Sequence, residues 1–358
     1  MTRVFWLSNE TPDRHGQGGQ RRQYFQIAAL VAAGHEIRVV TLSGPQDDTS
    51  VRDVADDVHR VPRLEARGRV PLHWRRRALR RRLAEWGEAI VIAHGESWER
   101  FEWALPPAVP ALVDLHNVYS RWPTEDSPGA AERWRALEQR IRRSVTAVSV
   151  TSTREAEALP GGPAEVIVVE NGVDPEEWTL EPVPAEAPVL KLFGNWGWAP
   201  NTLGVEWFLS QVWPQVCRVT SARCVIAGSG LNPDSLPTGA TAAGRVPDLQ
   251  RFLADAWAIA LPLPESVGSP VKYAEALAVG CPVITTTQGA PGHRSIPVIA
   301  DTAQQWVDTL TEWLSAPTPS AVLDNRERAD RLSVLSWARA TEPLSAWVRS
   351  PHLTQGPA

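Results

Sequence analysis

Short apolar runs alternate with longer amphipathic stretches along most of this chain of 358 residues. The stretch between the first two runs places its apolar residues at helical spacing and ends at Gly34. A strand, a helix and a second strand joined by short links form a βαβ unit, and its repetition predicts parallel sheets with helices on both faces. Strands are predicted at 3–8, 36–42, 89–94, 110–115, 145–150 and 165–171, then at 189–195, 222–230, 257–264 and 281–287.

One segment, TLEPVPAEAP at 179–188, interrupts the alternation. It is rich in Pro and Glu, and its apolar residues follow neither the helical period nor the strand period. We therefore expect an α/β protein with a Rossmann-like domain over 1–178, a linker at 179–188 and a second Rossmann-like domain over 189–334. Helices are predicted in the second domain at 201–216 and 246–256. Ligands of open parallel sheets bind beyond the carboxyl ends of the strands, so two facing sheets predict a site in the cleft between them.

Composition excludes several classes of function. The formal net charge is -5, so nothing global favours nucleic acid as a partner. The three cysteines lack zinc spacing, which indicates free thiols in a reducing cytoplasm and no metal site. No run approaches the length of a membrane-spanning helix, and the first apolar run is too short for a signal peptide. Lysine is rare beside arginine, as expected of a GC-rich bacterial genome.

The stretch SPVKYAEALAVGCPVITT, residues 269–286, contains one of the two lysines of the chain. Pro270 suits a first helical position, and the free N–H groups and dipole of a helix start attract anions. Lys272 adds a positive charge there, suited to a diphosphate, and Glu275 lies on the same face to accept hydrogen bonds from ribose hydroxyls. An exposed ion pair between Lys272 and Glu275 is the alternative. The preceding loop adds Ser266, Gly268 and Ser269 as donor-binding candidates.

Three further segments place polar residues or glycines after predicted strands. Gly18 and Gly19 precede the first helix and let a ligand approach the backbone, although a flexible loop tip would look the same. The segment VDLHNVYSRW contains His116 and Asn117, and IAHGESW contains His94 and Glu96 one strand earlier. A histidine at such a position is also compatible with a buried structural role. Donor-binding candidates at the start of the second domain are Asn195 and Gly197.

Taken together, these segments resemble glycosyltransferase family 4, the retaining transferases of the two-domain GT-B architecture. The resemblance is carried by GGQRRQYFQIAALVAAGH in the first domain, by VVENGVD at its end, and by FGNWGWAPNTLGVEWF and GRVPDLQRFLADAW in the second. The most specific match is VKYAEALAVGCPV, which follows the pattern Lys-x-x-Glu-Ala-x-Ala-x-Gly-x-Pro-Val. LSWARATEPLSAW, within 335–350, resembles the terminal helix that crosses back to the first domain.

The resemblance implies a role for each matching residue. Lys272 would bind the diphosphate of a nucleotide-sugar donor, and Glu275 would hold the ribose hydroxyls. Gly18 and Gly19 would offer N–H groups to the diphosphate, and His116 would face the transferred sugar. The resemblance further implies retaining transfer to an acceptor hydroxyl with no metal and no other cofactor, since Lys272 and helix starts stabilise the leaving charge.

Two departures from the family pattern leave the identity of the donor undetermined. The family often has a second acid eight positions before the glutamate, where this chain has Val267. No basic residue occurs in GNWGWAPN to share the phosphate charge. Two other functions therefore stay open, an epimerase of nucleotide-bound sugars and a non-catalytic binder of sugar nucleotides.

The acceptor is the least constrained partner. His94, Glu96 and Asn117 are the candidates for its side of the site, and a small molecule or a saccharide would suit them. The basic segment RVPLHWRRRALRRRLAEW, residues 69–86, is predicted as a helix. We favour a solvated arginine-rich face for it over contact with anionic lipid.

Overall fold

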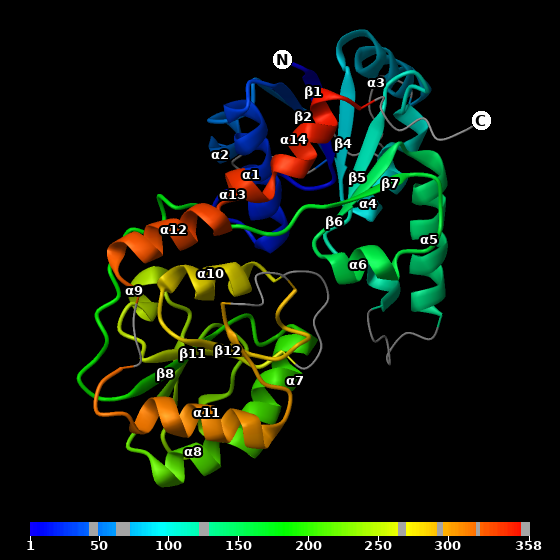
Figure 1. The fold of residues 1–358 in the computed structure, drawn as a ribbon. Coiled ribbons are helices and arrows are strands. Elements are labelled where there is room, and N and C mark those ends of the chain that lie inside the picture. The colour runs from blue at the N-terminus through cyan, green and yellow to red at the C-terminus, as the bar shows by residue number, and fades with distance from the viewer. Residues whose placement is uncertain are drawn as a thin grey trace. The chain divides into compact units, whose positions relative to one another are not determined.

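The computed structural model describes residues 1–42, 49–61, 72–121, 129–263, 270–291, 296–319 and 323–351. The chain divides into two compact units (Figure 1). The first unit consists of Met1–Asn171 together with Ala340–Ala358, and the second of Gly172–Arg339. Each unit is built around one parallel sheet.

The first unit has a seven-stranded parallel sheet with the order β3-β2-β1-β4-β5-β6-β7. The interior strand β1 pairs with β2 on one side and β4 on the other, so that Val4 lies opposite both Ile37 and Ala89. Residues of the central strands are buried on both faces, which explains their continuous apolar runs. The strands are β1 (Arg3–Ser8), β2 (Glu36–Thr41), β3 (Asp57–Arg60), β4 (Ala89–Ala93), β5 (Ala111–Asp114), β6 (Ala147–Val150) and β7 (Glu165–Val168).

Helices cover both faces of this sheet. Val4 and Trp6 of β1 pack with residues of α1, α2 and α14 on one face, whereas Phe5 and Leu7 pack with α3, α4 and α5 on the other. The helices of this unit are α1 (Gly18–Ala32), α2 (Thr49–Arg52), α3 (Leu72–Trp86), α4 (Gly95–Phe101), α5 (Ala130–Ser144), α6 (Thr153–Ala158) and α14 (Glu342–Arg349), with 3₁₀ turns at Glu102–Ala104 and Tyr119–Arg121.

The second unit has a six-stranded parallel sheet with the order β10-β9-β8-β11-β12-β13. Its strands are β8 (Val189–Phe193), β9 (Arg223–Ala227), β10 (Ala240–Gly244), β11 (Ala258–Leu261), β12 (Val283–Thr285) and β13 (Val298–Ile299). One face packs against α9 (Leu249–Leu253), α10 (Val271–Val279) and α12 (Asn325–Leu335). The other face packs against α7 (Ala199–Trp207), α8 (Trp213–Val219) and α11 (Ala303–Ser315). The two α/β units confirm the predicted fold class.

The change from one unit to the other occurs between Asn171 and Gly172. The segment at 179–188 has no helix or strand and is grouped with the second unit, where Val183 N–H donates to the Ala254 carbonyl at 2.7 Å. The chain returns to the first unit after Arg339, through α13 (Trp337–Ala340), and α14 packs against β7.

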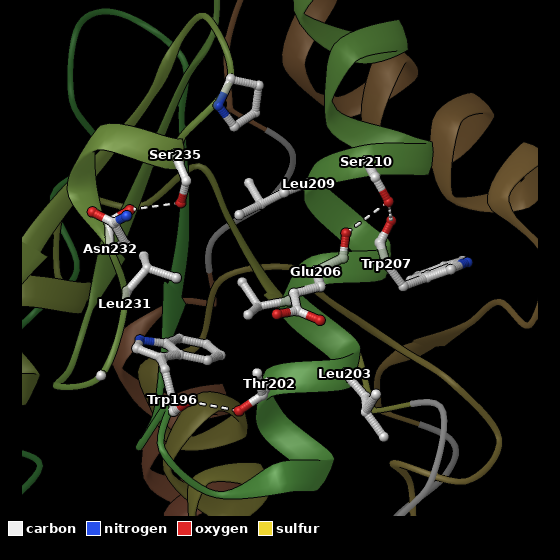
Figure 2. A pocket seen from close by; sticks show the side chains of 13 residues that line it. Trp196, Thr202, Leu203, Glu206, Trp207, Leu209, Ser210, Leu231, Asn232 and Ser235 are labelled. Carbon is white, nitrogen blue, oxygen red and sulfur yellow. Dashed lines mark hydrogen bonds between the residues drawn. The ribbon is translucent and has the colours of Figure 1, made fainter.

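The predicted helix at 201–216 is not continuous. A π-helical segment, Phe208–Val212, separates α7 from α8. Pro214 explains this interruption, because proline has no N–H to donate and its ring crowds the carbonyl four residues earlier. Within this segment the Ser210 hydroxyl donates to the Glu206 carbonyl at 2.7 Å (Figure 2).

The predicted basic helix corresponds to α3. Leu79 and Leu83 are buried in the core of the first unit, whereas Arg77, Arg80 and Arg81 are exposed. The described part of α3 thus presents arginines to solvent, and the lipid-contact alternative stays a hypothesis. Among the described residues, no helix combines the length and apolarity needed to cross a membrane.

Candidate active site

The first unit gathers polar side chains where the adjacent strands β1, β4 and β5 end. Glu10 lies two residues beyond β1, His94 directly follows β4, and His116 lies two residues beyond β5. The loop after β1 is fixed to α4, since Asn9 N–H donates to the Ser97 hydroxyl at 2.9 Å and that hydroxyl donates back to Asn9 Oδ1 at 3.0 Å. This edge is where parallel sheets bind ligands.

A buried ion pair joins α1 to this edge. Arg22 donates to both carboxylate oxygens of Asp114, from Nε at 2.9 Å and from Nη2 at 2.8 Å. Ser149 adds a hydrogen bond to Asp114 Oδ1 at 2.6 Å, and Arg22 also donates to Asn171 Oδ1 at 2.9 Å. Burial acts to raise the pKa of Asp114, but the charge and hydrogen bonds of Arg22 outweigh it and hold that pKa well below its usual range. Asp114 is therefore a fixed anion.

His116 is buried beside this anion. Its side chain is 6% exposed and its Nε2 lies 3.3 Å from Asp114 Oδ2. Burial, reinforced by the neighbouring His94, lowers the pKa of His116 to about 4, although Asp114 acts in the opposite direction. The imidazole is accordingly neutral near pH 7 and offers hydrogen bonds without charge.

The His94 ring packs against the His116 ring at an interplanar angle of 49°, and His94 pairs with Glu10. The two ring centroids are 3.5 Å apart, and His94 Nε2 lies 2.9 Å from Glu10 Oε1. Gln23 Nε2 donates to the same carboxylate oxygen at 2.9 Å. Burial acts to raise the pKa of Glu10, but the hydrogen bond and charge of His94 outweigh it and lower that pKa. Glu10 is therefore a carboxylate with two side-chain partners.

The backbone of His94 is strained. With φ at 69° and ψ at 147°, it is the one non-glycine residue of the described chain with a positive φ. This region is occupied almost only by glycine, and a side chain there costs about 1–3 kcal/mol. Such strain persists where the surrounding structure fixes it, and it concentrates at functional sites.

The predicted glycines lie within α1 rather than ahead of it. The helix begins at Gly18 because Gln17 and Gln20 form a capping box. A Cβ on Gly19 would lie 3.1 Å from His116 Nδ1 and 3.2 Å from His94 Cε1, so the structure brings this glycine together with both predicted histidines.

The other two acceptor-side candidates lie near the same strand ends. Glu96 is exposed in the first turn of α4, and Asn117 follows His116 directly and donates to the Tyr119 hydroxyl at 3.4 Å. Neither residue has a hydrogen bond to the histidines that the structure records. We therefore keep them as predictions.

The second unit holds Lys272 in the first turn of α10, where its Nζ donates to Asn201 Oδ1 at 2.5 Å. Asn201 Nδ2 in turn donates to the Asn195 carbonyl at 2.9 Å, which links α10, α7 and the loop after β8. Nζ also lies 5.8 Å from the centre of the Trp196 ring. The structure thus brings Lys272 and Asn195 together, with Gly197 two residues further along the same loop.

Lys272 is partly buried. Burial lowers its pKa to about 7, and Glu275 opposes this shift. Glu275 is only 7% exposed, so the alternative of a solvent-exposed ion pair does not describe these residues. A half-neutral lysine near pH 7 becomes fully charged when an anion binds beside it.

The other lysine has a structural role. Lys191 is 5% exposed in β8, and its ammonium pairs with Asp255 and donates to the Phe252 carbonyl. Its charge therefore holds β8 to the end of α9. Of the two lysines, Lys272 is the one whose recorded partner is a neutral amide.

Glycines bring the strand ends of the second unit into backbone contact. A Cβ on Gly228, which has a φ of +126°, would lie 1.7 Å from the Gly194 carbonyl oxygen. A Cβ on Gly230 would lie 2.6 Å from the Gly197 nitrogen. The loops after β8 and β9 therefore approach each other too closely at these two glycines for a side chain there, which fixes the loop that contains Asn195.

Three donor-binding candidates, Ser266, Gly268 and Ser269, lie outside the described residues, and so does Val267. The described part of this region begins at Pro270, the residue that precedes α10. Within the described chain, no group of three or more His, Cys, Asp or Glu side chains is arranged to hold a metal ion.

A pocket of about 710 Å³ lies in the second unit beside α7. Figure 2 shows Leu203 and Glu206 on the helix side and Leu231 and Asn232 on the connection from β9 to β10. Trp196 borders this pocket and also lies near the Lys272 ammonium. Of the predicted donor-binding residues that the structure describes, none lines the pocket.

Glu10, Gln23 and Asn201 were not among the predicted site residues. Glu10 follows the first strand almost directly, so the rule that ligands bind beyond strand ends could have identified it. Gln23 lies one helical turn after Gly19 on α1, which is a weaker signal. The contact of Asn201 with Lys272 joins residues 71 positions apart, so no local sequence pattern could have identified it.

Comparison with known proteins agrees with these two units. A family model for glycosyltransferase family 4 matches residues 17–177, and a model for glycosyl transferases group 1 matches residues 187–316. No curated protein sequence matches the chain significantly.

Solved structures show the same fold at low sequence identity. Sucrose-phosphate synthase from Thermosynechococcus elongatus is 16% identical with a TM-score of 0.71, and covers 98% of this chain and 99% of its own. HepE from Anabaena, solved with UDP and glucose, is 14% identical with a TM-score of 0.70, over 98% of this chain and 100% of its own. TarM is 9% identical with a TM-score of 0.73, over 98% and 99%. Two family models in sequence order and two parallel α/β units lead to one conclusion: the chain is a glycosyltransferase of family 4 with the GT-B fold.

Proposed function

We propose that this glycosyltransferase moves a sugar from a nucleoside-diphosphate donor to an acceptor hydroxyl, with retention of configuration and without a metal or other cofactor. The observation that carries the proposal is the Lys272 ammonium, which Asn201 positions in the first turn of α10. An ammonium at a helix N-terminus is a binding site for a diphosphate and stabilises the charge that develops as the diphosphate leaves. HepE, a solved structure with this fold, contains UDP and glucose.

Glu275 and Asn195 complete the donor half of this proposal. Glu275 lies on the same helix as Lys272, one turn later, and is assigned to the ribose hydroxyls. Asn195 and Gly197 lie on the loop that Asn201 fixes. A carboxylate that accepts two hydroxyl hydrogen bonds would orient the nucleoside while Lys272 holds the diphosphate.

In the first unit, we assign His116 to the transferred sugar and the N–H groups of Gly18 and Gly19 to the diphosphate. A neutral imidazole suits a sugar hydroxyl, because it can donate or accept a hydrogen bond without adding charge. The acceptor is a small molecule or a saccharide, and the proposed location is the cytoplasm, where nucleotide sugars are available.

The test is incubation with UDP-, GDP-, ADP- and dTDP-sugars and a panel of mono- and disaccharides, read by mass spectrometry. Release of the nucleoside diphosphate that depends on the acceptor, with a glycosylated product, supports transfer. NMR of the product then shows whether the anomeric configuration is retained, and addition of EDTA should leave the rate unchanged.

Other outcomes would contradict parts of this proposal. An altered sugar still attached to its nucleotide would indicate an epimerase, and binding with no product would indicate a non-catalytic binder. If His116→Ala left the rate at saturating substrates unchanged, the role of His116 would be wrong while the transfer reaction stood.

A further inference from the structure

We propose that Glu155 is a positioning residue for His116, because its buried carboxylate holds the segment after β5, residues 115–121 (the β5 loop), that carries this histidine. This inference deepens the proposed function and rests on it, since the position of His116 affects the reaction only if His116 contacts the transferred sugar. All the residues that carry the inference belong to the first unit.

Two buried carboxylates from different helices hold the β5 loop. Val118 N–H donates to Glu155 Oε1 of α6 at 2.8 Å. Ser120 donates to Glu138 of α5 twice, from its N–H at 3.0 Å and from its hydroxyl at 2.5 Å. Glu155 is 4% exposed and Glu138 is 2% exposed. Glutamate is rarely buried to this extent, and buried N–H groups bond mostly to backbone carbonyls, so this arrangement is specific to the loop.

Glu155 uses both of its oxygens. Oε1 accepts from Val118, whereas Oε2 accepts from Thr151 N–H at 3.1 Å and from the Thr151 hydroxyl at 2.6 Å. Thr151 directly follows β6, the neighbour of β5 in the sheet, so Glu155 joins the segments beyond two adjacent strands. A glutamine side chain has an accepting oxygen at only one of these two places. The geometry therefore requires a carboxylate.

Capping of α6 does not explain this carboxylate. Ser152 caps the helix, because its hydroxyl accepts from Glu155 N–H at 3.3 Å. A complete capping box would add a hydrogen bond from Ser152 N–H to the Glu155 side chain. Within the described chain no such bond is recorded, and the carboxylate contacts Thr151 and Val118 instead. Glu155 is thus directed away from its own helix and toward the β5 loop.

Stability does not explain it either. Burial raises the pKa of Glu155, although the hydrogen bonds from Thr151 and Val118 and the charge of Arg22 act in the opposite direction. Burial also raises the pKa of Glu138. The folded protein therefore holds the ionised groups less favourably than water does, and their contribution to stability falls as the pH rises from the usual glutamate pKa through the raised one. Residues that break such a rule are expected at functional sites.

The β5 loop determines where the imidazole of His116 lies. Its Nε2 is 3.3 Å from Asp114 Oδ2, and Arg22, whose charge acts on Glu155, fixes that carboxylate. On another side, a Cβ on Gly19 would lie 3.1 Å from His116 Nδ1, so the ring is closely packed. Such a ring has little space to compensate for a shift of its own backbone. Val118, two residues further along, fixes that backbone through Glu155.

The first experiment needs no substrate. Hydrogen exchange read by mass spectrometry compares the wild type with Glu155→Gln and with Glu157→Gln, an exposed change on the same helix. We expect faster exchange of the β5 loop in Glu155→Gln alone. In protein labelled with ¹⁵N-histidine, the ring signals of His116, identified by His116→Asn, should shift in Glu155→Gln and stay unchanged in Glu157→Gln.

The second experiment measures transfer with the donor and acceptor found by the panel of nucleotide sugars and saccharides. Glu155→Gln should lower kcat by about 10–100-fold, because a displacement of about 1 Å costs up to about 100-fold in rate. The dissociation constant of the nucleoside diphosphate of that donor should stay within about twofold, because Glu155 is not assigned to the donor. Glu157→Gln should match the wild type in both measurements.

A double variant tests whether Glu155 acts through His116. In a His116→Ala background, Glu155→Gln should lower kcat no further, because no imidazole is left to position. Losses that multiply in the double variant would mean that the two residues act independently, which contradicts the inference.

Thr151→Val provides a milder change in case Glu155→Gln does not fold. It removes the hydroxyl bond to Glu155 Oε2 and keeps both N–H donors. We expect a smaller loss of kcat, faster exchange of the β5 loop and unchanged affinity for the nucleoside diphosphate. If Glu155→Gln cannot be obtained folded, wild-type values for both kcat and exchange in Thr151→Val overturn the inference.

The outcomes separate this inference from the proposed function. A wild type that transfers sugar, with Glu155→Gln as active as Glu157→Gln, overturns the inference and leaves the proposed function intact. Faster exchange throughout the first unit, or loss of affinity for the nucleoside diphosphate together with kcat, would show a general structural role and overturn it as well. If the wild type transfers no sugar from any donor, the proposed function fails, and the role of Glu155 in catalysis fails with it even where the loop exchanges as expected.

Discussion

At the scale of single residues, the two lysines of this chain show how the surroundings decide what an ammonium does. Both lysines lie in the second unit. The ammonium of Lys191 forms an ion pair with Asp255, whereas that of Lys272 donates a hydrogen bond to the side-chain amide of Asn201. A charge paired with a carboxylate has little attraction left for a ligand. The recorded hydrogen-bond partner of Lys272 is a neutral amide, although the charge of Glu275 also acts on it, and we therefore assign Lys272 to the diphosphate.

Replacement of Lys272 by alanine should affect both donor binding and turnover. A charge-assisted contact contributes about 1.5–3 kcal/mol, so binding of the nucleoside diphosphate should weaken by about tenfold or more. The rate at saturation should also fall, because more charge develops as the sugar leaves. Calorimetry and turnover measure the two effects. Arg218→Ala, which removes an exposed charge from α8, is the control, and a Lys272→Ala enzyme that behaves like it would contradict the assignment.

Donor binding should take up a proton near pH 7. The pKa of Lys272 is about 7 in the free protein, and the negative diphosphate raises it by favouring the charged form. Affinity should therefore be highest below pH 7 and decline as the pH rises through the higher pKa of the bound state. A nucleotide sugar is the ligand to use, since its esterified diphosphate does not titrate in this range.

Calorimetry at pH 7.5 in Tris and in HEPES, which differ in ionisation enthalpy, measures this proton uptake. The apparent binding enthalpy should differ between the buffers for the wild type. It should be equal in the two buffers for Lys272→Ala. Equal enthalpies for the wild type would mean that Lys272 does not change its protonation on binding.

At the scale of elements, apolar runs predicted the interior strands and the edge strand β7, and failed for the three strands β3, β10 and β13. All three lie at the edges of their sheets. An edge strand has only one neighbour, and β10, with the sequence ATAAG, is exposed along much of its length. Its sequence therefore needs no continuous apolar run, which is the signal that identified the interior strands.

The candidate site was likewise predicted only in part. The rule that polar residues at strand ends form sites identified His94 and His116, because it depends only on local sequence. The pairing of His94 with Glu10 joins residues 84 positions apart, and no local pattern reports such a contact. The interruption at Phe208–Val212 had a visible cause in Pro214, but the helical spacing of apolar residues runs through it unchanged.

Gly228→Ala should disrupt the loops after β8 and β9. The new Cβ would meet the Gly194 carbonyl oxygen at 1.7 Å in a backbone conformation that alanine disfavours. Steric overlap and positive φ together should cost about 2–4 kcal/mol. Urea unfolding should show this loss. Gly161→Ala, at an exposed glycine with open space around it, should change stability by no more than about 0.5 kcal/mol. Similar losses in both variants would contradict the close packing of these loops.

At the scale of the whole molecule, the chain leaves the first unit after Asn171 and returns to it after Arg339. The returning helix α14 contributes Leu344, Trp347 and Val348 to the core that also contains Val4 and Ile27. The core of the first unit therefore contains residues from both ends of the chain. The second unit is contained in one continuous segment between them.

Leu344→Ala should loosen the first unit alone. Leu344 is fully buried, and such a truncation costs about 2–5 kcal/mol. Hydrogen exchange read by mass spectrometry should show faster exchange in β1, β2 and β7, with unchanged protection in the strands of the second unit. Val334→Ala, an exposed change on α12, is the matched control. Equal acceleration in both units would mean that they unfold together.

The route of the chain also sets an order of events during synthesis. Residues 1–171 are synthesised before the second unit, but the helix that completes their core is synthesised after it. At about 5–20 residues per second, the first unit waits roughly 10–35 s for α14 while the second unit is translated. During that time the face of the sheet that α14 will cover is open to water, to chaperones and to other nascent chains. The second unit is one continuous segment, so it can finish folding before the first unit although its synthesis begins later.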